Sequence, residues 1–218
     1  MSRFRVGIDI GGTFTDIVFL NSEGRLFTKK VPSSVDNYAR AIVEGMAEVF
    51  DEASITPKDI RELRHGTTVA SNAILELKGA RVGLITSAGF RDVLEIRTLR
   101  MPRLYDLAWE KPPSLVERYL RQVVDERINA NGVIERRPQR SEVEQVVRRL
   151  LDEKVEAIAI CLINAYANPD NERFVEDIVR EMAPDIPLCI SADVLPEMKE
   201  YERTSTTVIN AYVLPVVG

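Results

Sequence analysis

The most informative stretch of the sequence lies near its start and reads Gly7-Ile8-Asp9-Ile10-Gly11-Gly12-Thr13-Phe14-Thr15-Asp16. Before the glycine pair, apolar residues alternate with Gly7 and Asp9, and this period of two predicts a β-strand. After the pair comes Ile17-Val18-Phe19-Leu20, a continuous apolar run typical of a strand that is buried on both faces. The stretch therefore predicts two neighbouring strands joined by a tight glycine turn.

The glycine turn also has the composition of a phosphate-binding loop. Adjacent glycines let the backbone approach a ligand closely, and their N–H groups, together with the hydroxyls of Thr13 and Thr15, can donate to phosphate oxygens. Asp9 ends the first strand, where its carboxylate can hold a hydrated Mg²⁺ that bridges phosphates. The turn is neither a Walker A loop nor a dinucleotide Gly-x-Gly-x-x-Gly motif. An ordinary glycine hairpin is the alternative, but the acid and the two threonines favour phosphate binding.

Predicted strands and helices alternate along the rest of the chain. Further strands are predicted at residues 26–31, 63–65, 81–86, 157–163 and 188–191, and helices from about residue 36 to 50 and at 69–78, 141–151, 170–182 and 204–213. Ser141 and Glu144 match a capping box, and residues 122–128 and 132–135 match the two arms of a hairpin. Residues 97–120 look irregular. This alternation indicates an α/β fold with a largely parallel sheet.

The composition argues against several classes of protein. A net charge of −5 gives no reason to expect a nucleic-acid or membrane partner. No apolar run approaches the roughly 20 residues of a membrane span, and the amino terminus shows no signal peptide. Cys161 and Cys189 lie in apolar segments and are expected to be reduced thiols in the cytoplasm. A single histidine and two separated cysteines make a structural zinc site improbable.

The glycine turn resembles the first phosphate motif of the superfamily that unites sugar kinases, actin and the heat-shock ATPases. The rest of the chain resembles the hydantoinase A, 5-oxoprolinase and acetone carboxylase family. After the turn itself, the stretches that carry this resemblance are His65-Gly66-Thr67-Thr68-Val69-Ala70-Ser71-Asn72-Ala73, Gly89-Phe90-Arg91-Asp92-Val93-Leu94-Glu95-Ile96, Leu104-Tyr105-Asp106-Leu107, Glu200-Tyr201-Glu202-Arg203-Thr204-Ser205-Thr206-Thr207 and Asn210-Ala211-Tyr212. They span nearly the whole chain. Ser71 and Asn171 are two small departures from the residues that are usual in the family.

The resemblance implies a ribonuclease-H-like lobe of the actin-like ATPase superfamily with an additional α/β layer. We expect a mixed five-stranded sheet at its centre, and the extra layer from residues 120–195. On this basis residues 1–200 form the hydantoinase/oxoprolinase amino-terminal region, and residues 201–218 begin a second conserved region. Family subunits are considerably longer, so the chain is expected to be truncated before the second lobe.

The resemblance also implies a reaction, with ATP and Mg²⁺ as cofactors. The γ-phosphate of ATP would go to the oxygen of a cyclic amide such as a hydantoin or 5-oxoproline, and water would then open the ring. Asp9 would be catalytic and would hold Mg²⁺, while Gly11, Gly12, Thr13 and Thr15 would hold the phosphates. Asp16 would either join them or brace the turn. A carboxy-terminal lobe and a hydantoinase B-like partner subunit, or a fused half, would complete the enzyme.

His65 is the only histidine, and Gly66, Thr67 and Thr68 follow it. At the end of a strand, this segment can present N–H groups and hydroxyls to an anion, and His65 can shuttle a proton as a catalytic group. Alternatively, His65 is a packed histidine and a threonine caps the next helix. Both interpretations stay open, as does the role of Asn72, which would orient the site or face solvent.

Three arginines border the irregular segment. Arg97, Arg100 and Arg103 can meet a carboxylate or a phosphate, or form a solvated rim. Two other functions also compete with the cyclic-amide hydrolase. One is the ATP-using subunit of an acetone- or acetophenone-type carboxylase, which acts on a ketone and bicarbonate. The other is a non-catalytic nucleotide-binding module.

Overall fold

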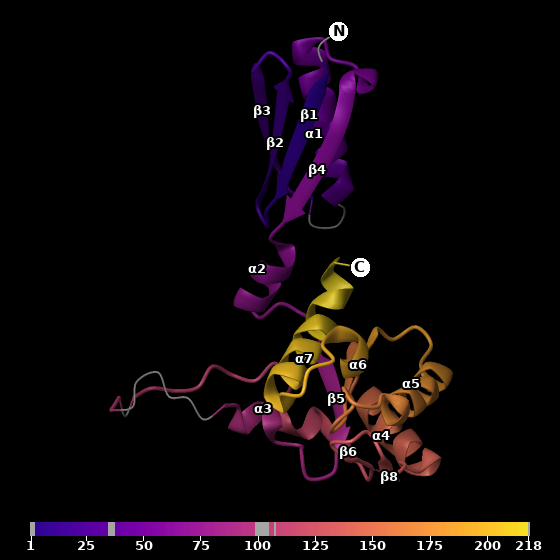
Figure 1. Cartoon of the computed structure of the whole chain (residues 1–218). Helices are drawn as coiled ribbons and strands as arrows, with labels where there is room; N and C mark the ends of the chain where they lie inside the picture. Colours follow the sequence, from indigo (N-terminus) through magenta and orange to yellow (C-terminus); the bar gives the residue numbers. More distant parts are fainter. Residues whose placement is uncertain (1–2, 35–37, 99–104, 107, 218) are drawn as a thin grey trace. The chain divides into compact units, whose positions relative to one another are not determined.

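The chain divides into two compact units, Met1–Glu76 and Leu77–Gly218 (Figure 1). The computed structural model describes residues 3–34, 38–98, 105–106 and 108–217. The first unit contains the glycine turn. The second contains the irregular segment and the longest of the described helices.

A four-stranded mixed sheet with the order β3-β2-β1-β4 forms the first unit. Strands β1 (Phe4–Ile10), β2 (Phe14–Asn21) and β3 (Leu26–Pro32) form antiparallel pairs, so the glycine turn joins paired neighbours as predicted. Strand β4 (Ile60–Thr67) is parallel to β1, and its register shifts once near the start of β1.

One face of this sheet packs against helix α1 (Tyr38–Ala53), which contacts β2 and β3. The ring of Phe19 lies edge-on to Phe4 at 6.5 Å and to Phe50 of α1 at 5.9 Å between centroids. A 3-10 turn η1 (Pro57–Asp59) precedes β4, and the short helix α2 (Val69–Leu75) follows it. The exposed residues of β1 lie on the other face of the sheet.

A second, fully parallel sheet with the order β10-β9-β5-β6 forms the second unit. Its strands are β5 (Val82–Ser87), β6 (Arg121–Val124), β9 (Ala157–Cys161) and β10 (Leu188–Ile190). Every residue of β5 and β9 is buried, as expected for central strands covered on both faces.

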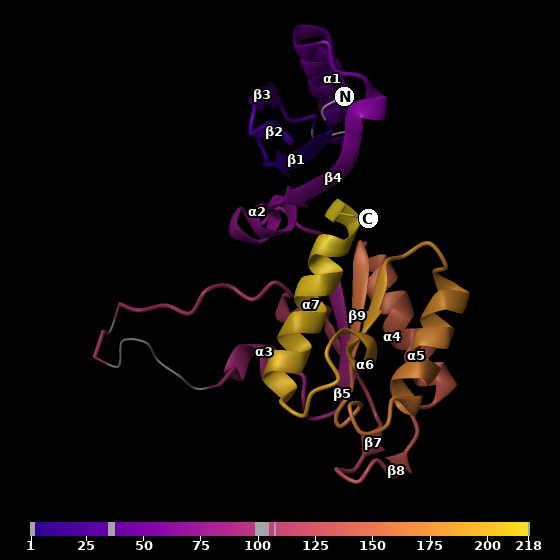
Figure 2. The ribbon, with the colours of Figure 1, turned by 45° about the horizontal axis from the view of Figure 1, so that its top comes forward.

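Helices flank both faces of the second sheet. Figure 2 shows helix α7 (Glu200–Val217) on one face, and helices α4 (Arg140–Asp152) and α5 (Asp170–Met182) on the other. The smaller elements are α3 (Val93–Ile96), η2 (Arg118–Leu120), the hairpin of β7 (Arg127–Ile128) with β8 (Ile134–Arg136), and α6 (Ser191–Val194).

The predicted α/β class is confirmed, but the predicted central sheet is wrong. The structure has two four-stranded sheets in place of one five-stranded sheet, because β5 pairs with β6 and β9 and does not join β1–β4. The boundary between conserved regions at residue 200 stays a prediction. In the structure, residues 200–217 form one helix that packs on β9 within the second unit.

Two helix ends differ from their prediction. The capping box of Ser141 and Glu144 does not form, since α4 begins one residue earlier and Glu144 instead accepts from Arg140 Nε at 2.9 Å. Helix α2 ends at Leu75, short of the predicted Lys78, because Leu77 turns the chain with a φ of 54°.

The predicted hairpin is correct only in part, because its first arm is divided. Residues 121–124 join the parallel sheet as β6, and only residues 127–128 pair with β8. The predicted start of α1 near Asp36 lies outside the described residues, as do Arg100, Arg103, Leu104 and Leu107.

Candidate functional site

A row of polar residues crosses the first sheet on the face opposite α1. Asp9 of β1 lies opposite Asp16 of β2 and Gly66 of β4, and Asp16 lies opposite Lys30 of β3. Directly opposed residues direct their side chains to the same face of a sheet. The row therefore brings two carboxylates and one ammonium group together beside the glycine turn.

The two carboxylates have unequal partners. Lys30 Nζ donates to both oxygens of Asp16, at 3.2 and 3.1 Å, and lies 5.3 Å from the centroid of the Phe14 ring. Asp9 has no hydrogen bond or ion pair with any other residue that the structure describes. Its carboxylate is exposed, and is therefore the one available for an added cation.

The row borders an open depression of about 390 Å³, lined in part by Gly7, Asp9, Asp16 and Gly66. A Cβ atom added at Gly7 or Gly66 would meet nothing within 4 Å, so the two glycines widen the depression without being needed for packing. The depression is polar at the carboxylate row, and it opens to solvent.

The donor set at this row fits Mg²⁺. Mg²⁺ prefers hard oxygen ligands, and it usually keeps several waters while binding one or two carboxylates plus substrate phosphates. Asp9 and Asp16 supply two adjacent carboxylates of this kind. A cage made wholly of protein ligands is absent, since the described residues contain no group of three or more His, Cys, Asp or Glu side chains that could hold a metal.

Hydrogen bonds within the glycine turn and from a residue after β3 fix the shape of the turn. Gly11 N donates to Phe14 O at 3.0 Å, and a Cβ at Gly11 would lie 2.9 Å from that same oxygen, which requires glycine there. Ser33, just after β3, donates from its backbone to Thr13 O at 2.9 Å and from its hydroxyl to Gly11 O at 2.7 Å. Sequence reasoning missed Ser33.

The backbone N–H groups of Gly12 and Thr13 find no acceptor in the part of the chain that the structure describes. Both residues are exposed at the tip of the turn. Unpaired backbone donors on a tight turn can bind an anion. The turn therefore offers two free N–H donors on adjacent residues.

The predicted Gly66-Thr67-Thr68 segment lies beside this turn. Ile10 O, at the end of β1, accepts from Thr67 Oγ1 at 3.1 Å and from Thr68 N at 3.2 Å. Asn72 also approaches the turn, since a Cβ at Gly12 would lie 3.3 Å from its Nδ2 atom. The sequence-predicted segments around residues 11 and 67 are thus brought together.

Two predicted site residues lie apart from the carboxylate row. Thr15 is fully buried on the α1 face, where its hydroxyl lies 2.9 Å from Ser33 Oγ. His65 borders the depression, but it lies opposite Ile8, so its side chain is on the face away from Asp9. Both residues support or flank the strands of the site, and their predicted roles in binding and catalysis stay predictions.

A family model described as the hydantoinase/oxoprolinase N-terminal region matches residues 5–183 of the chain. Caprolactamase subunit alpha of Pseudomonas jessenii is 35% identical over 222 residues, which cover 99% of this chain and 32% of the relative. 5-oxoprolinase 1 of Arabidopsis thaliana is 31% identical over 246 residues, which cover 99% of this chain and 19% of the relative.

Two solved structures have the same arrangement of elements. The ATP-dependent caprolactamase of Pseudomonas jessenii matches with a TM-score of 0.86 at 35% identity, over 98% of this chain and 32% of that chain. Nucleotide-free acetone carboxylase matches with a TM-score of 0.89 at 27% identity, and the match covers 99% of this chain and 33% of that chain. The chain thus spans about a third of the length of these proteins. None of its described helices is long and apolar enough to cross a membrane.

Proposed function

The chain belongs to the hydantoinase/oxoprolinase N-terminal region family, and from this membership we propose that it carries the first phosphate-binding part of an enzyme that uses ATP to open a cyclic amide. Relatives named as an ATP-dependent caprolactamase and as 5-oxoprolinase support the substrate class. The observation that carries the proposal is the free Asp9 carboxylate next to the two unpaired N–H groups of Gly12 and Thr13.

The chemistry explains why ATP is needed. Resonance makes an amide carbon a poor electrophile. Transfer of the γ-phosphate to the amide oxygen breaks the terminal P–O bond of ATP, releases ADP and makes the carbon reactive. Water then adds to the carbon, and the C–N bond breaks with a proton going to nitrogen. A second water cleaves the resulting acyl phosphate to a carboxylate and inorganic phosphate.

The residues of this chain would act on the phosphates. In phosphoryl transfer, the protein mainly positions the groups and neutralises charge. The N–H groups of Gly12 and Thr13 would donate to phosphate oxygens, and Asp9, with Asp16 beside it, would hold Mg²⁺. When bound there, Mg²⁺ would offset the negative charge of the phosphates. Lys30 would keep Asp16 in place through its two hydrogen bonds.

We propose that other parts of the enzyme supply the rest of the site. The sheet face that carries Asp9 is open to solvent, whereas phosphoryl-transfer sites work best when water is excluded. A second lobe would cover the adenosine. A hydantoinase B-like partner subunit or fused half would complete the ring opening, in keeping with the subunit name of the caprolactamase relative.

The test is Asp9→Asn in the complete ATP-using enzyme with its partner. We expect turnover to fall on the order of 10²-fold, because a charge that organises the metal and phosphates is lost. Glu62→Gln is the matched control, since Glu62 lies on the same face further down β4, where Arg64 pairs with it. Near-normal turnover of Asp9→Asn would remove Asp9 from the mechanism. Turnover that requires bicarbonate would show a carboxylase instead.

A further inference from the structure

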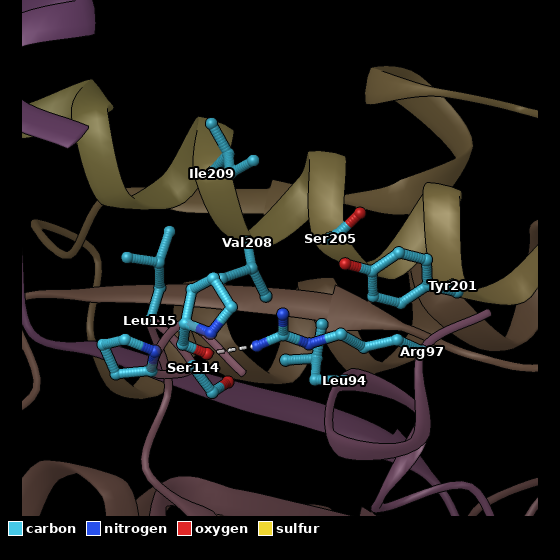
Figure 3. A pocket seen from close by; sticks show the side chains of 10 residues that line it. Leu94, Arg97, Ser114, Leu115, Tyr201, Ser205, Val208 and Ile209 are labelled. Atoms are coloured by element: carbon cyan, nitrogen blue, oxygen red, sulfur yellow. Dashed lines mark hydrogen bonds between the residues drawn. The ribbon is translucent and has the colours of Figure 1, made fainter. Parts of the chain in front are cut away.

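A second cavity lies wholly within the second unit, whereas the glycine turn belongs to the first. It has a volume of about 170 Å³ and is bounded by helix α3, the segment at 112–115 and helix α7 (Figure 3). Tyr201, Ser205, Val208 and Ile209 face it from α7, spaced by three and four residues along one side of the helix. The proposed phosphate chemistry makes no use of this cavity.

One end of the cavity is polar. The side chains of Tyr201 and Ser205 lie there, with the guanidinium of Arg97 nearby (Figure 3). Ser205 Oγ donates to Glu202 O at 3.2 Å. The Tyr201 hydroxyl has no partner among the residues that the structure describes, and is therefore a free donor.

Arg97 has no counter-anion among the residues that the structure describes. Its guanidinium donates to the backbone oxygen of Pro112, and it has no carboxylate within ion-pair distance in the described ranges. A guanidinium has five N–H donors in a planar fork that matches a carboxylate. Most of those donors are unused in this cavity.

The backbone of Arg97 is strained. Its φ of 59° and ψ of −144° lie in a region that glycine adopts readily and other residues rarely do. The residue closes α3, where its N–H donates to Val93 O at 2.9 Å. Glycine would satisfy the backbone better at this position, but would leave no cation in the cavity. Backbone strain of this kind is found most often at functional sites.

The other end of the cavity is apolar. Leu115 and Ile209 lie there, with Val208 between them and the guanidinium (Figure 3). A ligand with a charged head and a short apolar body would match both ends. The volume is about six times the roughly 30 Å³ that one water occupies in the liquid, so the body must be small.

We propose that this cavity binds a small monocarboxylate with a short alkyl chain, its carboxylate on Arg97 and Tyr201 and its chain against Val208, Leu115 and Ile209. Arg97 supplies the single positive charge among the residues that line the cavity, and it matches one negative charge. A doubly charged phosphate would leave one charge unmatched away from water. An uncharged alcohol of the same length would leave the Arg97 donors unpaired.

The test is a titration of the purified 218-residue chain, followed by two-dimensional NMR. Acetate, butyrate, hexanoate, 1-butanol and inorganic phosphate are the probes. We expect saturable shifts at residues of α3 and α7, with butyrate binding more tightly than acetate and at least roughly tenfold more tightly than 1-butanol. Equal binding of 1-butanol, or no saturation by any carboxylate up to concentrations on the order of 0.1 M, would overturn the proposal.

Two variants separate a binding role of Arg97 from a structural one. Arg97→Gly should lose butyrate binding by at least about tenfold while raising the melting temperature, because glycine relieves the backbone strain. Arg148→Gln, on the exposed side of α4, is the matched control and should change neither the butyrate affinity nor the melting temperature. Tyr201→Phe keeps the ring and removes one donor, so it should weaken butyrate binding and leave the melting temperature unchanged. Unchanged butyrate affinity in both cavity variants would contradict the assignment, even if Arg97→Gly proved less stable.

Discussion

Ser33 holds the glycine turn from a position outside the motif. Its hydroxyl bonds to Gly11 O and lies 2.9 Å from Thr15 Oγ1, so one side chain connects both ends of the turn. We expect Ser33→Ala to lower the free energy of unfolding by about 1–2 kcal/mol, because it leaves part-buried groups unsatisfied. Chemical denaturation of the chain measures this change.

Ser34→Ala is the control for that experiment. Ser34 is the next residue along the chain and is similarly half-buried, but makes no hydrogen bond with another described residue. Equal stability of the two variants would show that Ser33 does not brace the turn.

Glu172 gives the second unit a pH-dependent stability. The side chain is fully buried and accepts from Leu162 N, Ser191 Oγ and Ala192 N at 2.6–2.9 Å. Burial raises the pKa of Glu172 from 4.5 to about 7. The folded state therefore binds the proton of the Glu172 carboxyl group more tightly than the unfolded chain does. The resulting stabilisation is complete below about pH 4.5 and is lost as the pH rises to about 7.

The pKa shift of Glu172 corresponds to a loss of unfolding free energy on the order of 3 kcal/mol between about pH 4.5 and 7. We expect Glu172→Gln to flatten this part of the stability profile, whatever its effect on stability at a single pH. Glu181→Gln, at an exposed position that pairs with Arg140, should leave the slope unchanged. Melting temperatures recorded at pH values from 4.5 to 7.5 test this. A slope that survives in Glu172→Gln would assign it to other groups.

The residues of the turn were accessible to sequence reasoning because they form a contiguous motif. Ser33 was not, since its contact depends on how β3 pairs with β2. The face of His65 depends on the register of β4 against β1, and that register shifts once at a bulge. A shift of one residue moves every side chain to the opposite face, and the pattern of β4 alone does not reveal it.

Among the elements, α7 depends on a glycine that precedes β5. A Cβ at Gly79 would lie 2.1 Å from the ring of Tyr212, whose backbone oxygen accepts from Ala80 N at 2.9 Å. The ring is buried and cannot move away freely. We expect Gly79→Ala to cost roughly 1–3 kcal/mol of unfolding free energy through overpacking.

Gly7→Ala is the matched change for Gly79→Ala. An added Cβ there meets nothing within 4 Å, so the same methyl group should cost little. Urea denaturation of both variants gives the comparison. A Gly79→Ala chain as stable as Gly7→Ala would mean that α7 can shift to make room.

Element existence was predictable where burial has a clear period. Helix α5 has the predicted bounds, because its buried residues follow the helical repeat closely. The start of helix α4 at Arg140 was not predictable, since Ser141 lies inside the helix and no side chain caps that end. Hydrogen bonding at helix ends competes with other local bonds, so a capping pattern alone does not fix a boundary.

At the scale of the whole molecule, the assignment of β5 could not be derived from the sequence. Its continuous apolar run shows that both faces are covered, but not which strands lie beside it. The choice depends on pairing with β6 and β9, whose residues lie some 35 to 80 positions further along the chain. The α/β class was predictable, and the division into two sheets was not.

We expect the 218-residue chain alone to hydrolyse no ATP at a measurable rate and to bind Mg-ATP with millimolar affinity at best. Asp9, Gly12 and Thr13 are exposed on an open face, where screening and ordering costs offset most of the gain from phosphate contacts. Calorimetry and a phosphate-release assay measure both quantities. Micromolar binding or steady turnover would show that these residues form a complete site.

The free outer edge of the first sheet has a consequence for solubility. Strand β3 lies at that edge, and such edges can template the addition of strands from other copies, which leads to aggregation. β3 carries Lys29 and Lys30 in succession, and Lys29 is anchored to Glu48 and Glu52 of α1 at 2.6 and 2.9 Å. Pro32 also lacks the N–H that an incoming strand would need. The strand that follows the glycine turn's hairpin thus discourages amyloid-like stacking.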